Sequence, residues 1–319
     1  MKKIVVINSF GPMGSTVIAS IIEHLNYLNF HTMRKVGLNE YLINLKSLED
    51  DFMKNNVIRK LSSFSENQIT GGVSVLDRNK QSPKKRYDLN KVADELNVYK
   101  KKKYTSIKNL YFDSYEIFNK ATIYKPKKNN PKGVIELTNN IYKIEASKLY
   151  ENYTNEFETV FFINIKRNFI NWLNSFASQY YSYPNLSRKN FFFRVSAILK
   201  QFKKYEEKVE LFKGLNIEFN EIFLPNTNLL LDKICNFLQE EKNLKWNDFE
   251  YDLYGSLKNY KETFTKFDDS VYFLPKIFFK IFNRLNKYYF KNFLIDFTLD
   301  VIFQIIYLIG YFNFKKNYK

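Results

Sequence analysis

The chain has 319 residues, of which 45% are hydrophobic, enough to bury one sizeable core and a smaller appendage. It has one cysteine, Cys235, which excludes a disulfide framework and a zinc site built from cysteine pairs, and favours a reducing, cytoplasmic compartment. The formal net charge of +17 is typical of proteins with anionic partners. Lysine is abundant together with Asn, Ile, Phe and Tyr, however, so the total charge alone assigns no partner.

The first predicted element is a buried strand at Ile4–Asn8 that runs into a glycine-containing turn. The apolar run there is about five residues, against about 7 to 15 in the core of a signal peptide, so we expect a strand of the fold. Beyond the turn, a predicted helix carries apolar residues on one face: Val17, Ile18, Ile21, Ile22, Leu25 and Leu28.

The turn, "FGPMGST", predicts a phosphate-binding loop. Gly11 and Gly14 would let the backbone approach an anion closely, and Ser15 and Thr16 add hydroxyl donors at a helix N-terminus. The full ATP- and GTP-binding pattern requires a lysine directly after the second glycine, where this chain has Ser15. An ordinary NTPase is therefore disfavoured, and a plain strand-to-helix turn is the alternative.

The segment 78–132 is strongly basic, with 16 Lys or Arg against 5 Asp or Glu. One interpretation is a solvated insertion, because charge runs are usually surface. The other is a basic rim that attracts an acidic acceptor.

Further strands and helices alternate later in the chain. Residues 159–165, "TVFFINI", predict a central parallel strand covered on both faces. A helix marked by Phe169, Trp172, Leu173 and Phe176 follows, then a strand at 215–223 and a helix at 228–241. The predicted fold class is α/β, a parallel sheet with helices on both faces.

Arg167 follows the central strand, and Ser175 lies eight residues later, two helical turns on. This spacing allows a cation and a hydroxyl to converge on one phosphate. At these residues the chain resembles the sulfotransferases that use 3′-phosphoadenosine 5′-phosphosulfate (PAPS). The resemblance rests on "PMGST" and "RNFINWLNS", continues through "IEFNEIF" and "LLLDKICNFL", and covers about residues 1–250 with a weakly matching middle.

The resemblance implies a P-loop NTPase-like three-layer sandwich over residues 1–255, with the basic insertion around 78–132. It also implies that Gly14, Ser15 and Thr16, after Gly11, hold the 5′-phosphosulfate of PAPS. Arg167 and Ser175 would hold its 3′-phosphate.

The chain departs from the family at two positions. Phe169 stands where the family usually has Pro, a residue that shapes the turn. Pro12 stands where the family has the Lys or Arg that stabilises the leaving oxygen, and losing one such donor typically costs about a hundred- to thousandfold in rate. Another cation must supply this charge or activity is low; the candidates are Arg34, Lys35, Arg188 and Lys189.

The acceptor hydroxyl also needs a general base. Glu40 lies 28 residues beyond Pro12 and resembles the glutamate base of the carbohydrate branch of the family; a surface carboxylate is the alternative. His31 is the second candidate base, whereas His24 is expected to be a helix-surface or packed residue. No metal is expected, because no His, Asp and Glu cluster is present.

Residues 256–319 are expected to form a helical, basic and apolar C-terminal extension. Cations recur every three or four residues between Lys276 and Lys291, and the apolar segment 293–312 follows with a narrow polar stripe at Asp296, Asp300 and Gln304. Lysines flank this apolar segment on both sides, which favours in-plane contact of 271–319 with an anionic membrane surface. Packing on the body or on a partner, and a true span, are the alternatives.

The sequence therefore predicts a PAPS-dependent sulfotransferase acting on a hydroxyl of a carbohydrate or lipid-linked glycan. It is expected in the cytoplasm, with peripheral attachment to a membrane as an option. A noncatalytic nucleotide-binding protein of the same fold is the alternative, and Pro12 is its best evidence. A small-molecule kinase is opposed by the missing loop lysine. Nucleic acid is not an expected partner, because aromatic residues do not line the basic runs.

Overall fold

The fold is seen in a computed structural model of the chain. It describes residues 3–11, 13–29, 87–123, 127–138, 141–143, 145–169, 172, 195–223 and 227–241, together with 297, 300, 301 and 305.

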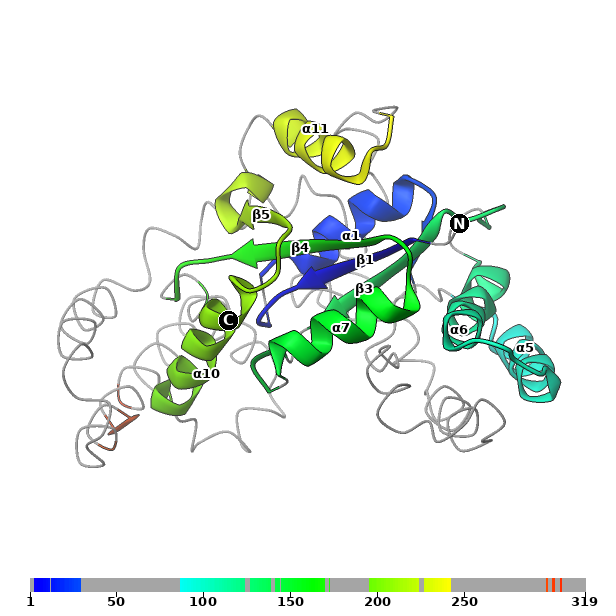
Figure 1. Ribbon diagram of the computed structural model, residues 1–319, viewed down its shortest axis with the longest axis horizontal. Helices are drawn as coiled ribbons and strands as arrows, with labels where there is room; N and C mark the ends of the chain where they lie inside the picture. The colour runs from blue at the N-terminus through cyan, green and yellow to red at the C-terminus, as the bar shows by residue number, and fades with distance from the viewer. Residues whose placement is uncertain are drawn as a thin grey trace, which may run out of the picture.

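Five parallel strands form one sheet in the order β2-β3-β1-β4-β5 (Figure 1). The strands are β1 (Lys3–Asn8), β2 (Tyr27–Leu28), β3 (Gly133–Thr138), β4 (Val160–Lys166) and β5 (Leu215–Glu218). The two strands predicted from continuous apolar runs are β1 and β4, which pair at the centre of the sheet. The predicted fold class, α/β with a parallel sheet between helices, is confirmed.

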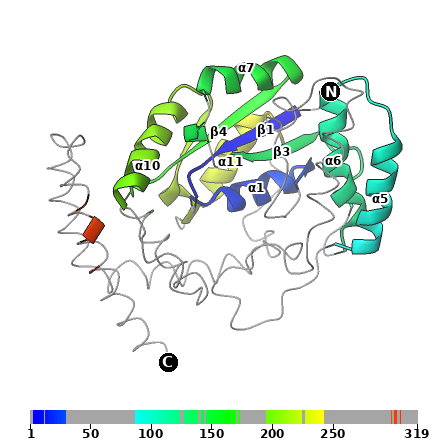
Figure 2. The ribbon, with the colours of Figure 1, turned by 90° about the horizontal axis from the view of Figure 1, so that it is seen from below.

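Helices cover both faces of the sheet (Figure 2). Successive residues of β4 show the two faces: the ring of Phe161 contacts Phe237, and the ring of Phe162 contacts Tyr153. The first face is covered by α1 (Ser15–His24) and α11 (Thr227–Leu238), the second by α7 (Ala146–Glu156) and α10 (Val195–Val209). Burial on both sides explains why the central strands are apolar almost throughout.

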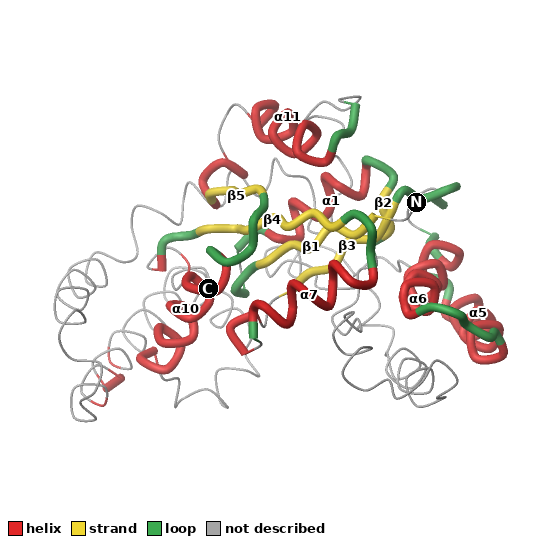
Figure 3. Tube along the Cα trace, in the orientation of Figure 1, coloured by secondary structure: helices red, strands yellow, loops and turns green. Residues whose placement is uncertain are grey.

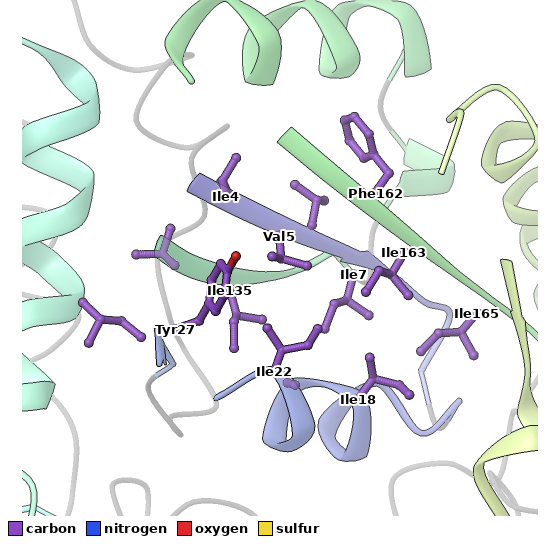
Figure 4. Packing of buried hydrophobic residues seen from close by; sticks show 14 of the residues in the cluster. Ile4, Val5, Ile7, Ile18, Ile22, Tyr27, Ile135, Phe162, Ile163 and Ile165 are labelled. Carbon is purple, nitrogen blue, oxygen red and sulfur yellow. The ribbon is translucent and has the colours of Figure 1, made fainter. Parts of the chain in front are cut away.

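Part of the core lies between α1 and the strands (Figure 4). Ile18 and Ile22 of α1 point toward Ile7 of β1 and Ile163 of β4, and all four are fully buried. The apolar face predicted for this helix is thus the face that fixes α1, and with it the preceding turn, on the sheet.

Two helices within the basic segment were not predicted. α5 (Leu89–Lys101) and α6 (Ile107–Ala121) lie beside the β2 edge of the sheet (Figure 3). α6 buries a row of aromatic side chains, and the hydroxyl of Tyr111 donates a hydrogen bond to the buried carboxylate of Glu136, as does that of Tyr153. In the part of the segment that is described, the lysines therefore decorate helices that belong to the folded body.

The helix predicted through Leu28 is shorter than expected. α1 ends at His24, because Asn26 adopts a left-handed conformation (φ 69°), and its side chain donates to the carbonyls of Asn129 and Asn130. Leu28 then belongs to β2, where it pairs with Val134.

The strand predicted over 215–223 is also shorter. β5 ends at Glu218, the last residue with a pairing partner on β4, and the carboxylate of Glu221 accepts the N–H of Glu218. A 3₁₀ helix, η2 (Phe219–Phe223), follows. A second 3₁₀ helix, η1 (Ile141–Lys143), follows β3.

Four residues of the C-terminal extension are described, Phe297, Asp300, Val301 and Ile305, and all are helical. Among the helices of the described residues, none has the length and apolar character that a bilayer span requires. The predicted boundary between the two parts of the chain, at 255/256, lies outside the described residues.

Candidate functional site

The candidate site lies where the strand order changes direction. The chain leaves β1 toward β2 on one side of the sheet and leaves β4 toward β5 on the other, so β1 and β4 flank the topological switch point. In open α/β sheets, ligands bind outside the carboxyl ends of the strands at such a point. The predicted glycine loop follows β1 and Arg167 directly follows β4, so the topology brings both to this position.

The glycine loop needs glycine at both positions. Gly11 (φ 62°) and Gly14 (φ 80°) are left-handed, a conformation that costs other residues free energy. Side chains would also be crowded there: a Cβ on Gly14 would lie 2.7 Å from Cδ1 of Ile222, which would have to shift, and one on Gly11 would lie 3.3 Å from the Trp172 ring.

Aromatic packing fixes the start of the loop. The Trp172 indole N–H donates to the carbonyl of Phe10, and the ring of Phe10 packs against Tyr142 and Phe202. Trp172 comes from the helix predicted to follow β4. The segment after β4, which contains Arg167 and Trp172, therefore holds the glycine loop after β1 in position.

The loop ends at the N-terminus of α1, with Gly14 as the cap residue. Its carbonyl accepts the N–H of Val17 and of Ile18, which starts the helix. Ser15 is buried, and neither its N–H nor its hydroxyl bonds to another residue within the described part of the chain. Unpaired donors at a helix N-terminus favour an anion. Thr16 is the next residue of the helix; its side chain is outside the described set.

Arg167 lies beside this helix terminus. Its side chain is buried, and the guanidinium carbon lies 3.5 Å from the centroid of the Phe219 ring, a cation–π contact. The same ring packs against the loop, since a Cβ on Gly14 would be 3.5 Å from its Cε2 atom. One aromatic ring therefore contacts the cation after β4 and lies beside the glycine that caps α1.

A pocket of about 340 Å³ opens next to Arg167. It is lined by Met13, Lys166, Arg167, Asn168, Phe202, Tyr205, Glu206, Val209, Glu210 and Glu218. The Lys166 ammonium pairs with Glu210. Burial raises the pKa of Glu206, an effect that Glu207 and Glu210 reinforce and that Lys203 and Lys166 oppose. The pocket thus combines two cations with three carboxyl groups, and Arg167 is the buried one of the cations.

The structure brings together five of the predicted site residues at the carboxyl ends of β1 and β4: Gly11, Gly14, Ser15, Thr16 and Arg167. Outside the described residues lie Ser175, the candidate bases Glu40 and His31, Pro12, and the candidate cations Arg34, Lys35, Arg188 and Lys189. His24 is exposed at the far end of α1, with Nδ1 2.8 Å from the carbonyl of Ser20, as expected for a helix-surface histidine.

Two residues of this region were missed by the sequence analysis. Phe219 was assigned to a strand on its apolar character, and only the turn into η2 places it under Arg167. Lys143 was not distinguished from other lysines; it ends η1, at the carboxyl end of β3 next to β1. Among the described residues, no group of three His, Cys, Asp or Glu side chains could hold a metal ion.

No family model and no curated protein matches the chain. Among solved structures, it is similar to a sulfotransferase domain from the curacin biosynthetic pathway. The two share 11% sequence identity with a TM-score of 0.40, and the match covers 76% of this chain and 75% of that domain.

Proposed function

We propose that the chain is a PAPS-dependent sulfotransferase that acts on a hydroxyl of a carbohydrate or lipid-linked glycan. The observation that carries the proposal is the Phe219 ring, which stacks on the guanidinium of Arg167 and lies beside Gly14 at the N-terminus of α1. The N-terminus of α1 and Arg167 follow neighbouring strands, and each can bind an anion. Together they suit a ligand that carries two separate phosphate groups, as PAPS does.

In this proposal the two ends of the donor bind to different elements. The N–H groups at the start of α1 and the Ser15 hydroxyl hold the 5′-phosphosulfate, which favours the positive end of the helix dipole. Arg167, with Ser175, holds the 3′-phosphate. Stacking on Phe219 fixes the plane of the Arg167 guanidinium, so that a bidentate contact needs little reordering.

Sulfuryl transfer then moves SO₃ in line from the bridging phosphate oxygen to the acceptor oxygen. The new sulfur–oxygen bond forms as the old one breaks, the base takes the proton of the acceptor hydroxyl, and negative charge grows on the leaving 3′,5′-bisphosphate. Glu40 is our first candidate for the base and His31 the second.

The negative charge on the leaving bisphosphate needs a cation to stabilise it. The loop itself supplies none, because Pro12 stands where the family has a Lys or Arg. We assign this role to Lys143. Its Nζ lies 5.5 Å from the centroid of the Tyr142 ring, and that ring lies 5.2 Å from the ring of Phe10, directly before Gly11. Lys143 is exposed, and none of the described carboxylates forms an ion pair with it, so its long side chain is available to the loop.

The alternative, a nucleotide-binding protein without turnover, keeps the same donor site and differs only in the reaction. Pro12 favours it. The two functions are separated by turnover and not by binding.

The test is calorimetric titration with 3′,5′-adenosine bisphosphate, beside ATP with magnesium. We expect micromolar binding of the bisphosphate, weakened by Arg167→Lys, which keeps the charge but loses the planar fork. Ser15→Ala should also weaken binding, whereas Ser20→Ala should not; the two serines lie in one helix and each is 6% exposed. Absence of bisphosphate binding, or equal effects of the two serine variants, would refute the site. Binding without sulfuryl transfer to any glycan acceptor would select the noncatalytic alternative.

A further inference from the structure

The C-terminal extension carries an exposed apolar stripe that the proposed donor site does not use. Phe297, Val301 and Ile305 are 59%, 41% and 53% exposed. Each of the three is helical and they are spaced by four residues, the spacing of one helix face. Other exposed large apolar residues of the described chain, such as Leu89, Leu211 and Leu229, are far apart in the sequence and do not follow the spacing of one helix face.

The sequence places a polar residue directly before each member of this stripe. Asp296, Asp300 and Gln304 each precede one member of the stripe by one residue, which on a helix is a turn of about 100°. Apolar and polar rows side by side are typical of a helix at a boundary between oil and water, and the two aspartates oppose a transbilayer position.

The charges of the extension indicate that the lipid surface it matches is anionic. Residues 271–319 contain eight Lys or Arg and only two Asp or Glu, and the lysines stand on both sides of the apolar segment, from Lys276 to Lys291 and from Lys315 to Lys319. Cations on both flanks of an apolar stripe match an anionic lipid surface, where each contributes attraction to the headgroups.

We infer that the C-terminal extension docks the protein in the plane of an anionic membrane surface, with Phe297, Val301 and Ile305 entering the interface. This surface is independent of the donor site, so its failure leaves the proposed function untouched. It would place the body beside acceptors that are themselves carried on lipids.

The experiment is vesicle flotation of the full chain with phosphatidylcholine alone and with phosphatidylcholine mixed with phosphatidylserine. We expect binding to the mixed vesicles, reduced by salt, and little binding to phosphatidylcholine. Serine at all three positions, Phe297, Val301 and Ile305, should weaken binding at least about tenfold. A matched variant with serine at Leu89, Leu211 and Leu229 removes three exposed apolar side chains from the body and should bind normally.

A second variant tests the charges: glutamine at Lys276, Lys280 and Lys287 should weaken binding by about fivefold per lysine. The inference is overturned if the two serine variants bind alike, or if neutral vesicles bind equally well. It is also overturned if alkaline carbonate fails to release the protein from membranes, which would indicate a span. The same holds if the stripe variant changes only the molar mass in light scattering, which would make the stripe an interface between copies.

Discussion

At the scale of single residues, Gly14 is the most constrained position of the candidate site. Alanine there would hold a side chain at φ 80° and press its Cβ against Ile222. We expect Gly14→Ala to lower the free energy of unfolding by about 1–3 kcal/mol and to abolish bisphosphate binding, because the N–H groups of the loop must move. Urea denaturation and calorimetry measure the two effects.

The double variant Gly14→Ala with Ile222→Ala separates the causes. It removes the steric contact but leaves the left-handed strain, so binding should stay weak even where packing is relieved. Full recovery of binding in the double variant would mean that crowding, and not the backbone conformation, makes glycine necessary.

The role assigned to Lys143 is a second prediction at this scale. Lys143→Met keeps an unbranched side chain and removes the charge that lies over the Tyr142 ring. If Lys143 acts on the leaving group, turnover should fall about a hundred- to thousandfold while bisphosphate affinity changes little. Lys100→Met, at an exposed lysine of α5, is the control. Equal turnover in the two variants would exclude Lys143.

Some residues of the candidate site could be predicted from the sequence and others could not. Gly14 and Arg167 were predicted because each stands in a local pattern, a turn after an apolar strand and a cation at a strand end. Phe219 and Lys143 stand in no such pattern. Their positions depend on contacts between η2, η1 and the strands that precede them, which no local spacing encodes.

At the scale of elements, a row of polar residues crosses four strands just below the loop, and its side-chain hydrogen bonds join three of them, β1, β4 and β5. Thr138, Asn8, Asn164 and Asn216 are aligned in the sheet register. Asn164 is the centre of the row: its Oδ1 accepts from Asn8 at 2.9 Å, and its Nδ2 donates to the carbonyl of Phe212 at 2.9 Å and to Asn216 at 3.2 Å. The row fixes β1 against β4 at the level where both lead into the site.

Asn164→Leu should therefore lower stability by about 1–3 kcal/mol, because it leaves the buried Asn8 amide and the Phe212 carbonyl without partners. Bisphosphate binding should weaken too. Asn216→Leu, at the exposed end of the row, should change stability by less than about 0.5 kcal/mol. Chemical denaturation decides between the two variants, and equal stabilities would show that the row does not hold the strands together.

Helices and strands could be predicted where their apolar side chains follow a clear helical or strand pattern in the sequence. β1 and β4 are buried on both faces and read as apolar runs. α6 was missed because its buried face is made largely of tyrosine and phenylalanine inside a lysine-rich segment, whose composition is typical of surface. β5 was extended too far, since its length is set by the end of β4 and not by its own residues.

At the scale of the whole molecule, Glu240 binds the end of the sheet where the strands begin, opposite the site. After α11, its carboxylate accepts hydrogen bonds from Lys3 at 3.2 Å and Tyr27 at 3.1 Å, and also from Lys132. These three residues belong to β1, to β2 and to the position before β3. One carboxylate, 6% exposed, thereby joins the last described helix of the body to three strand beginnings.

This arrangement makes stability depend on pH. Burial alone would raise the pKa of Glu240, but the hydrogen bonds from Lys132, Lys3 and Tyr27 outweigh it and lower the pKa below its ordinary value of 4.5. A carboxyl group with a lowered pKa in the folded state contributes stability that is complete above the unfolded-state pKa and is lost as pH falls through the folded-state pKa. The contribution of Glu240 should therefore be constant near neutrality and decline below about pH 4.5.

Glu240→Gln removes the titrating group. We expect it to cost about 1–3 kcal/mol at pH 7, because the two lysines lose their charged partner, and the difference from the unmodified protein should shrink as the solution is made more acidic. Urea denaturation between neutral and acidic pH measures this difference. Glu151→Gln, at an exposed position of α7, is the control and should show no such convergence. Because Glu240 lies where the strands begin and the glycine loop lies where they end, bisphosphate affinity at neutral pH should be unchanged. A parallel loss of affinity would mean that the two ends of the sheet are coupled.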